Sequence, residues 1–105
     1  MVIAVLRLSL LIPEAASLKA KRKVLHALKD RVKSRFNVSI AEVGTLDLWQ
    51  KSEIGVTAVG NDQRALNSKM DKLLNFIEST ALVEPVSAAL EFIHVNQSWS
   101  AQEWD

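Results

Sequence analysis

Residues 37–60, "NVSIAEVGTLDLWQKSEIGVTAVG", decide the fold of this chain of 105 residues. The segments "NVSIAEV" (37–43) and "SEIGVTAVG" (52–60) are rich in β-branched residues at alternating positions, which predicts two strands. The polar stretch "GTLDLWQK" between them predicts a turn, so the two strands form a hairpin. What lies on either side of this hairpin determines how the sheet is completed.

A helix is predicted on each side of the hairpin. Upstream, Ser17 is a candidate N-cap for a helix that ends near Phe36. Downstream, "ND" at 61 and 62 is a capping pair for a helix that runs to about Ser79. Apolar residues recur at helical spacing in both segments. They are Leu18, Leu25, Leu28 and Val32 in the first helix, and Leu66, Met70, Leu73, Leu74 and Ile77 in the second.

Two outer segments complete the predicted sheet. Residues 2–12 alternate along a strand that is apolar on both faces, which indicates a central position, and Pro13 ends it. Glu84 and Pro85 separate the second helix from a last strand, "VSAALEFIHV" (86–95). The order β-α-β-β-α-β with right-handed crossovers predicts an α+β ferredoxin-like fold, a four-stranded antiparallel sheet with two helices on one face.

Composition predicts one compact domain over residues 1–95 and an irregular tail, "NQSWSAQEWD" (96–105). The chain has no cysteine, which excludes disulfides, thiolate chemistry and a zinc ribbon and favours the cytoplasm. The N-terminal "MVIAVLRLSLLIP" lacks a basic leader, and no stretch reaches the roughly 20 apolar residues of a membrane span. We therefore expect no membrane association.

The charges are unevenly distributed along the sequence. Residues 1–36 hold nine Lys or Arg against two acids, whereas residues 37–105 hold four against ten. At 100° per residue, most cations of the first helix fall within an arc of about 120°, opposite its apolar side. A basic helix face with lysines instead of acids in its first turn favours phosphate as a ligand. The candidate nucleic-acid or anion-binding residues are Lys19, Lys21, Arg22, Lys23, His26, Lys29 and Lys33.

The simplest alternative is that this stripe is only the solvated face of a helix. The KH-domain GXXG loop is missing, and so are the strand aromatics with which an RRM stacks bases. Any RNA contact is therefore expected to reach the backbone and not to read bases. On the two central strands, the residues that face away from the helices are predicted to be Val5, Arg7, Ser9, Glu53, Gly55, Thr57 and Val59.

Sequence motifs for catalysis are missing. There is no GxxxxGK loop, GxSxG elbow or HExxH pair, and "IPEAASLKAKR" lacks the Gly-rich phosphate loop of acylphosphatases, which share this element order. His26 and His94 lie in different elements without a cluster of carboxylates, which argues against a metal site. We therefore expect a protein that is not an enzyme and that needs no metal or cofactor.

The predicted turn contains a second candidate site. Asp47, Trp49, Gln50 and Lys51 are candidate partner contacts, because an aromatic ring in a polar turn is either packed down or displayed to a protein or nucleobase. The same two alternatives hold for Trp99 and Trp104 in the tail.

The open face of the sheet is a candidate for self-association. It is expected to be apolar for a solvated surface, which favours a symmetric homodimer, unless the tail folds back over it. The apolar residues expected there are Val5, Val43, Val59, Ala89 and Ile93, and the charged ones are Arg7, Glu53 and Glu91.

Four stretches resemble one known family. "SLKAKR", "FNVSIAEV", "DLWQKSEIGV" and the "ND" before the second helix are similar, in order and spacing, to the bacterial YlxP-like family, domain of unknown function 503. The resemblance covers residues 1–95 and implies a ferredoxin-like fold. Genes of that family often lie among genes of translation and ribosome maturation, which implies a link to RNA or the ribosome. The family commonly has Glu where this chain has Ala20, so its capping box is absent here, and it brings no catalytic residues.

Taken together, the residues and the resemblance predict a cytoplasmic binding module that associates with RNA or the ribosome through its basic first helix. The alternative is a homo-oligomeric protein-interaction domain with no role in nucleic-acid binding.

Overall fold

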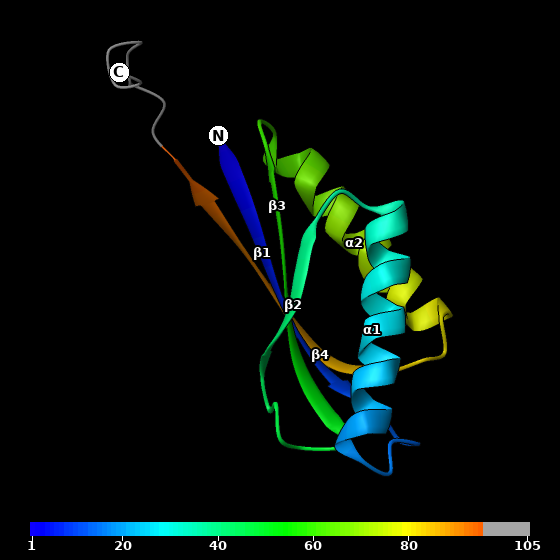
Figure 1. Ribbon diagram of the computed structural model, residues 1–105. Helices are drawn as coiled ribbons and strands as arrows, with labels where there is room; N and C mark the ends of the chain where they lie inside the picture. Colours follow the sequence, from blue (N-terminus) through cyan, green and yellow to red (C-terminus); the bar gives the residue numbers. More distant parts are fainter. Residues whose placement is uncertain (96–105) are drawn as a thin grey trace, which may run out of the picture.

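The computed structural model describes residues 1–95 and confirms the predicted order of elements (Figure 1). The predicted tail, with Trp99 and Trp104, lies outside the described residues. The six elements are β1 (Val2–Leu11), α1 (Leu18–Arg35), β2 (Ser39–Gly44), β3 (Lys51–Gly60), α2 (Gln63–Ser79) and β4 (Glu84–His94).

The four strands form one antiparallel sheet in the order β2-β3-β1-β4. As predicted, β1 is central: its Ala4 lies opposite Ala58 of β3 on one side and Phe92 of β4 on the other. Figure 1 shows α1 and α2 on the same side of the sheet. The predicted α+β ferredoxin-like fold is therefore confirmed, and none of the described residues forms a helix on the other face of the sheet.

The core lies between the helices and the sheet. Alternate residues of β1 point into it, and the apolar sides of both helices close over them, as the two periodicities require. A fully buried aliphatic side chain contributes roughly 1.5–3 kcal/mol. Leu18 is only partly buried, but the rest of the predicted helical stripe forms or borders the core. The completely buried side chains of the helices are Leu28, Val32, Met70, Leu73 and Ile77.

Both predicted helix caps are present. The backbone N–H of Ala20 donates to Ser17 Oγ at 3.0 Å, and the N–H of Arg64 donates to Asp62 Oδ1 at 3.0 Å. Each side chain satisfies one of the free N–H groups in the first turn of its helix. The first turn of α1 contains no acidic residue, so its capping relies on Ser17.

Two predicted strand boundaries are wrong. Strand β2 spans Ser39–Gly44, so it starts later than the predicted 37–43. Strand β4 already begins at Glu84, and Pro85 pairs with Leu10 inside the ladder. Proline is tolerated there because β4 is an edge strand and the register shifts at this point, between Ser9 and Leu10.

Candidate nucleic-acid interface

The basic side of α1 lies next to β2, one of the two edge strands of the sheet. Five of the seven predicted phosphate contacts are exposed on this helix: Lys19, Arg22, Lys23, His26 and Lys33. Lys29 is partly buried, and it lies on the same side of the helix as Arg22, Lys23 and His26.

A shallow depression of about 420 Å³ brings four of these side chains together. It lies between α1 and β2, because α1 supplies every lining residue except Glu42. The lining residues are Arg22, Lys23, Leu25, His26, Lys29 and Glu42. Three permanent cations and a histidine around one hollow form a surface suited to an anion.

Lys21 does not belong to this surface, which corrects its assignment as a phosphate contact. Its side chain is only 1% exposed, and Nζ lies 2.8 Å from Glu42 Oε2 and donates to the Thr45 carbonyl oxygen at 2.6 Å. At 100° per residue Lys21 falls on the apolar side of α1, in line with Leu25 and Val32. This spacing is visible in the sequence, and it is the signal that distinguishes buried Lys21 from the exposed cations next to it.

The acid that lines the depression is already paired. Glu42 has a side chain 15% exposed; its Oε2 meets Lys21 Nζ and also accepts a hydrogen bond from Ser52 Oγ at 2.8 Å. Its charge is therefore directed inward, toward a buried cation. On the exposed side, His26 Nε2 lies 3.3 Å from Asp30 Oδ2, and both of those side chains are largely in solvent. The outer surface of the depression is thus dominated by Arg22, Lys23 and Lys29.

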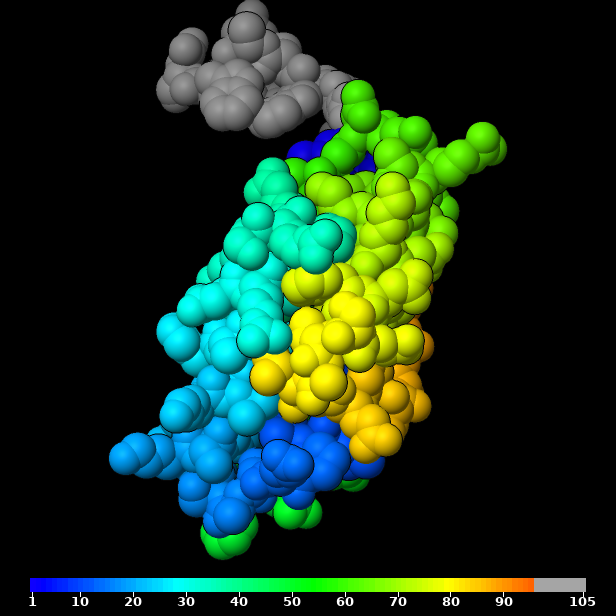
Figure 2. Space-filling model, turned by 90° about the vertical axis from the view of Figure 1, so that its right-hand side faces the viewer, coloured from blue at the N-terminus to red at the C-terminus, as the bar shows by residue number. Residues whose placement is uncertain are grey.

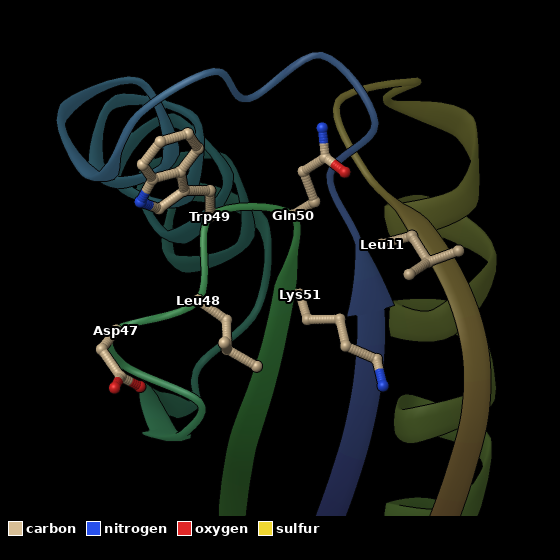
Figure 3. Close-up of a pocket in the computed structure, with 6 residues that line it drawn as sticks. All are labelled: Leu11, Asp47, Leu48, Trp49, Gln50 and Lys51. Carbon is tan, nitrogen blue, oxygen red and sulfur yellow. The ribbon is translucent and has the colours of Figure 1, made fainter.

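The loop between β2 and β3 forms the second candidate site. It borders an open pocket of about 590 Å³ lined by the predicted contacts Asp47, Trp49, Gln50 and Lys51, together with Leu11 and Leu48 (Figure 3). Trp49 is 53% exposed, so the structure favours a displayed ring over a packed one. Leu46 and Leu48 are also exposed, at 64% and 46%. Both leucines are missing from the predicted partner contacts, although apolar residues close to Trp49 in a polar turn were a signal for them.

This loop is held against the start of α1. Gln50 Nε2 donates to the carbonyl oxygens of Pro13 and Ala15, each at 3.3 Å, and the Ile12 N–H donates to Gln50 O at 2.9 Å. At the other end of the loop, Lys21 holds the carbonyl of Thr45, which has a left-handed φ of 56°. Gln50 therefore anchors the loop as well as lining the pocket, and Trp49 projects from a fixed backbone.

The open face of the sheet carries the residues predicted for it. Val59, Val43 and Ile93 are exposed at 64%, 60% and 50%, and a hollow of about 230 Å³ lies among Arg7, Glu53 and their neighbours. Self-association through this face stays a prediction.

Within residues 1–95, no three His, Cys, Asp or Glu side chains are grouped so that they could hold a metal ion. No helix in the same range combines the length and the apolar character needed to cross a membrane.

Comparison with known proteins identifies a family that matches most of the described domain. A family model described as "Protein of unknown function (DUF503)" matches residues 3–90. The uncharacterised protein YlxP of Bacillus subtilis (strain 168) is 39% identical over 74 residues, which cover 70% of this chain and 80% of that protein. Together these matches show that the chain belongs to the YlxP-like DUF503 family, as the order and spacing of its motifs predicted.

Proposed function

We propose that this protein is a non-enzymatic cytoplasmic module that binds RNA, free or in the ribosome, through phosphate contacts of α1. One observation carries the proposal: Arg22, Lys23, His26 and Lys29 surround a single depression, while Glu42, the one acid among the described residues that line it, is paired with a buried lysine. Phosphate groups are the anions that such a cluster of exposed cations binds along a nucleic-acid backbone.

The N-terminal end of α1 extends the same surface. The first turn has no acidic residue, and Lys19 is exposed in it. Cations in a first turn oppose the helix dipole by about 0.3–1 kcal/mol each at low salt. A bound phosphate would relieve this cost, because it is attracted both by the lysine and by the free N–H groups.

Trp49 offers a second kind of contact in the same complex. Its exposed ring stands on the loop that Gln50 ties to the segment leading into α1. A nucleobase of single-stranded RNA can stack on such a ring, since every base has a π-face and a fixed tryptophan loses little freedom on binding. The link to translation implied by the family resemblance favours ribosomal RNA as the source.

The test compares two triple variants that remove the same charge from different helices. The first is Arg22→Gln, Lys23→Gln, Lys29→Gln on α1. The control is Arg64→Gln, Lys69→Gln, Lys72→Gln on α2. The two sets match in residue type and in burial, because Lys29 and Lys69 are partly buried and the others are exposed. Net charge is therefore equal in both variants, and only its position differs.

Binding is measured by fluorescence anisotropy with a labelled single-stranded ribosomal RNA fragment, and by co-sedimentation with ribosomes. We expect the α1 variant to lose more than about 10-fold in affinity, because three phosphate contacts disappear, and the α2 control to lose far less. Equal losses of affinity in both variants would mean that binding depends on net charge and not on the position of the cations. An unchanged α1 variant, or a native protein that binds neither probe, would overturn the proposal.

A further inference from the structure

Within residues 1–95, strand β4 leaves a long edge of the sheet unpaired. It spans 11 residues, Glu84–His94, and its only neighbour among the described strands is β1. Along its other side, the backbone N–H and C=O groups of alternate residues point away from β1, where a further strand could accept and donate hydrogen bonds. The opposite edge, β2, has only six residues.

The two edges differ in how they are protected against pairing. Strand β2 is short, is interrupted by a register shift between Glu42 and Gly44, and lies beside the cations of α1. These are features by which proteins block strand addition. In β4, Pro85 and the register shift protect only the first residues. From Val86 to His94, Glu91 is the only acidic or basic residue apart from the terminal histidine.

The helix layer also stops short of β4. Ala88 pairs with the buried Leu8, on the side of the sheet that the helices cover, yet Ala88 itself is exposed. Val86 is 55% exposed. In Figure 2, which looks onto the helix layer, orange atoms of β4 emerge beside α2. In the part of the chain that the structure describes, the strand is thus uncovered along its edge and, near Ala88, on its helix side as well.

From this edge we infer that β4 pairs antiparallel with β4 of a second copy of this chain, about a two-fold axis, so that one continuous sheet runs through both copies. A two-fold arrangement needs a surface that complements itself. An antiparallel strand edge does so through its backbone alone, because each donor meets an acceptor of the other copy.

The small residues of β4 fit this pairing. A two-fold axis across an antiparallel pair places one residue opposite its own copy. An axis at Ala88 therefore places Ser87 opposite Ala89 of the other copy. The middle of the strand, Ser87 to Ala89, has only small side chains, which allows two copies to approach closely.

This inference is independent of the proposed RNA binding and compatible with it. The basic depression borders β2, at the edge of the sheet farthest from β4. Pairing through β4 would leave both depressions free, at the two ends of the joined sheet.

The test uses multi-angle light scattering of the full chain over a series of concentrations. The key variant is Ser87→Lys, Ala89→Lys, which would bring lysines of the two copies together at the centre of the pairing. The control is Ser39→Lys, Ala41→Lys on β2. All four residues are exposed and lie on the open face, opposite Ser9, Arg7, Thr57 and Gly55 respectively. Addition of lysine there should leave the fold intact, which circular dichroism checks.

We expect a dimer for the native chain and for the β2 control, and a monomer for the β4 variant. A native chain that is monomeric throughout, or a β4 variant that remains dimeric, would overturn the inference. Loss of the dimer in both variants would also overturn it, and would assign the contact to the open face instead.

A second measurement on the native chain needs no substitution. Hydrogen exchange at low and high protein concentration should show that amides of residues 86–92 become more protected as concentration rises, while those of residues 39–44 do not. Protection that is independent of concentration in both strands would contradict pairing through β4, even if the β4 variant failed to fold.

Discussion

The ammonium group of Lys21 lies 2.8 Å from the Oε2 atom of Glu42, beneath the exposed cations of α1. This ion pair joins the helix to edge strand β2, and Ser52 and the Thr45 carbonyl complete it. It separates two kinds of basic residue that lie close together in the sequence. Lys21 is a buried structural group, whereas Arg22 and Lys23 are exposed at the depression.

The first prediction concerns this pair. Lys21→Met keeps most of the length of the side chain but removes its charge, which leaves Glu42 and the Thr45 carbonyl without the ammonium group that they share. We expect the free energy of unfolding to fall by about 3 kcal/mol, because breaking one side of a buried pair strands the other charge. Urea denaturation measures the change. The same substitution at exposed Lys23 should stay within about 0.5 kcal/mol of the native protein. Equal stabilities of the two variants would mean that the buried pair contributes nothing.

A second prediction concerns the left-handed residue that follows α2. Ala81 has a φ of 58° and is exposed. An L-residue with a Cβ is strained in this conformation, and glycine is not. Ala81→Gly should therefore raise the free energy of unfolding by about 1 kcal/mol, seen as a higher melting temperature. The matched control, Ala65→Gly in the exposed first turn of α2, should lower stability instead. A lower free energy of unfolding for Ala81→Gly would show that backbone strain at this residue does not destabilise the native protein.

The third prediction concerns the salt dependence of RNA binding. If the cations around the depression contact phosphates, the affinity should fall linearly on a double logarithmic plot against salt concentration. Each lost contact should reduce the slope by about 0.7 for single-stranded RNA. Lys23→Gln alone should therefore flatten the slope measurably, whereas Lys72→Gln on α2 should leave it unchanged. Identical slopes for the native protein and the Lys23 variant would exclude a phosphate contact at that residue.

The fourth prediction concerns Trp49. Because the ring is 53% exposed, Trp49→Ala should change the free energy of unfolding by no more than about 0.5 kcal/mol. Affinity for single-stranded RNA should weaken by about 1–3 kcal/mol, the usual contribution of one stacked base. Trp49→Phe should restore much of the binding, whereas Leu48→Ala should affect it little. A marked drop in melting temperature for Trp49→Ala would identify the ring as a packing residue instead.

The order of the elements could be predicted because it depends on short-range patterns. Alternation in residues 2–12, the apolar stripes of both helices and the capping residues Ser17 and Asp62 each act over a few positions. Right-handed crossovers then leave few arrangements, so the ferredoxin-like topology followed. Pro85 misled the prediction of β4, since proline usually interrupts a strand and is tolerated here only by an edge position and a bulge.

The sequence by itself determined the fold, the family and the concentration of cations in α1. Only the tertiary structure decided which of these cations are exposed and which are buried. Lys21 meets Glu42 across 21 positions of sequence, a pairing that exists only once α1 packs beside β2. The display of Trp49 likewise depends on Gln50, which reaches back to Pro13 and Ala15. Secondary structure follows local periodicity, whereas the exposure of a charge or a ring depends on what distant segments place against it.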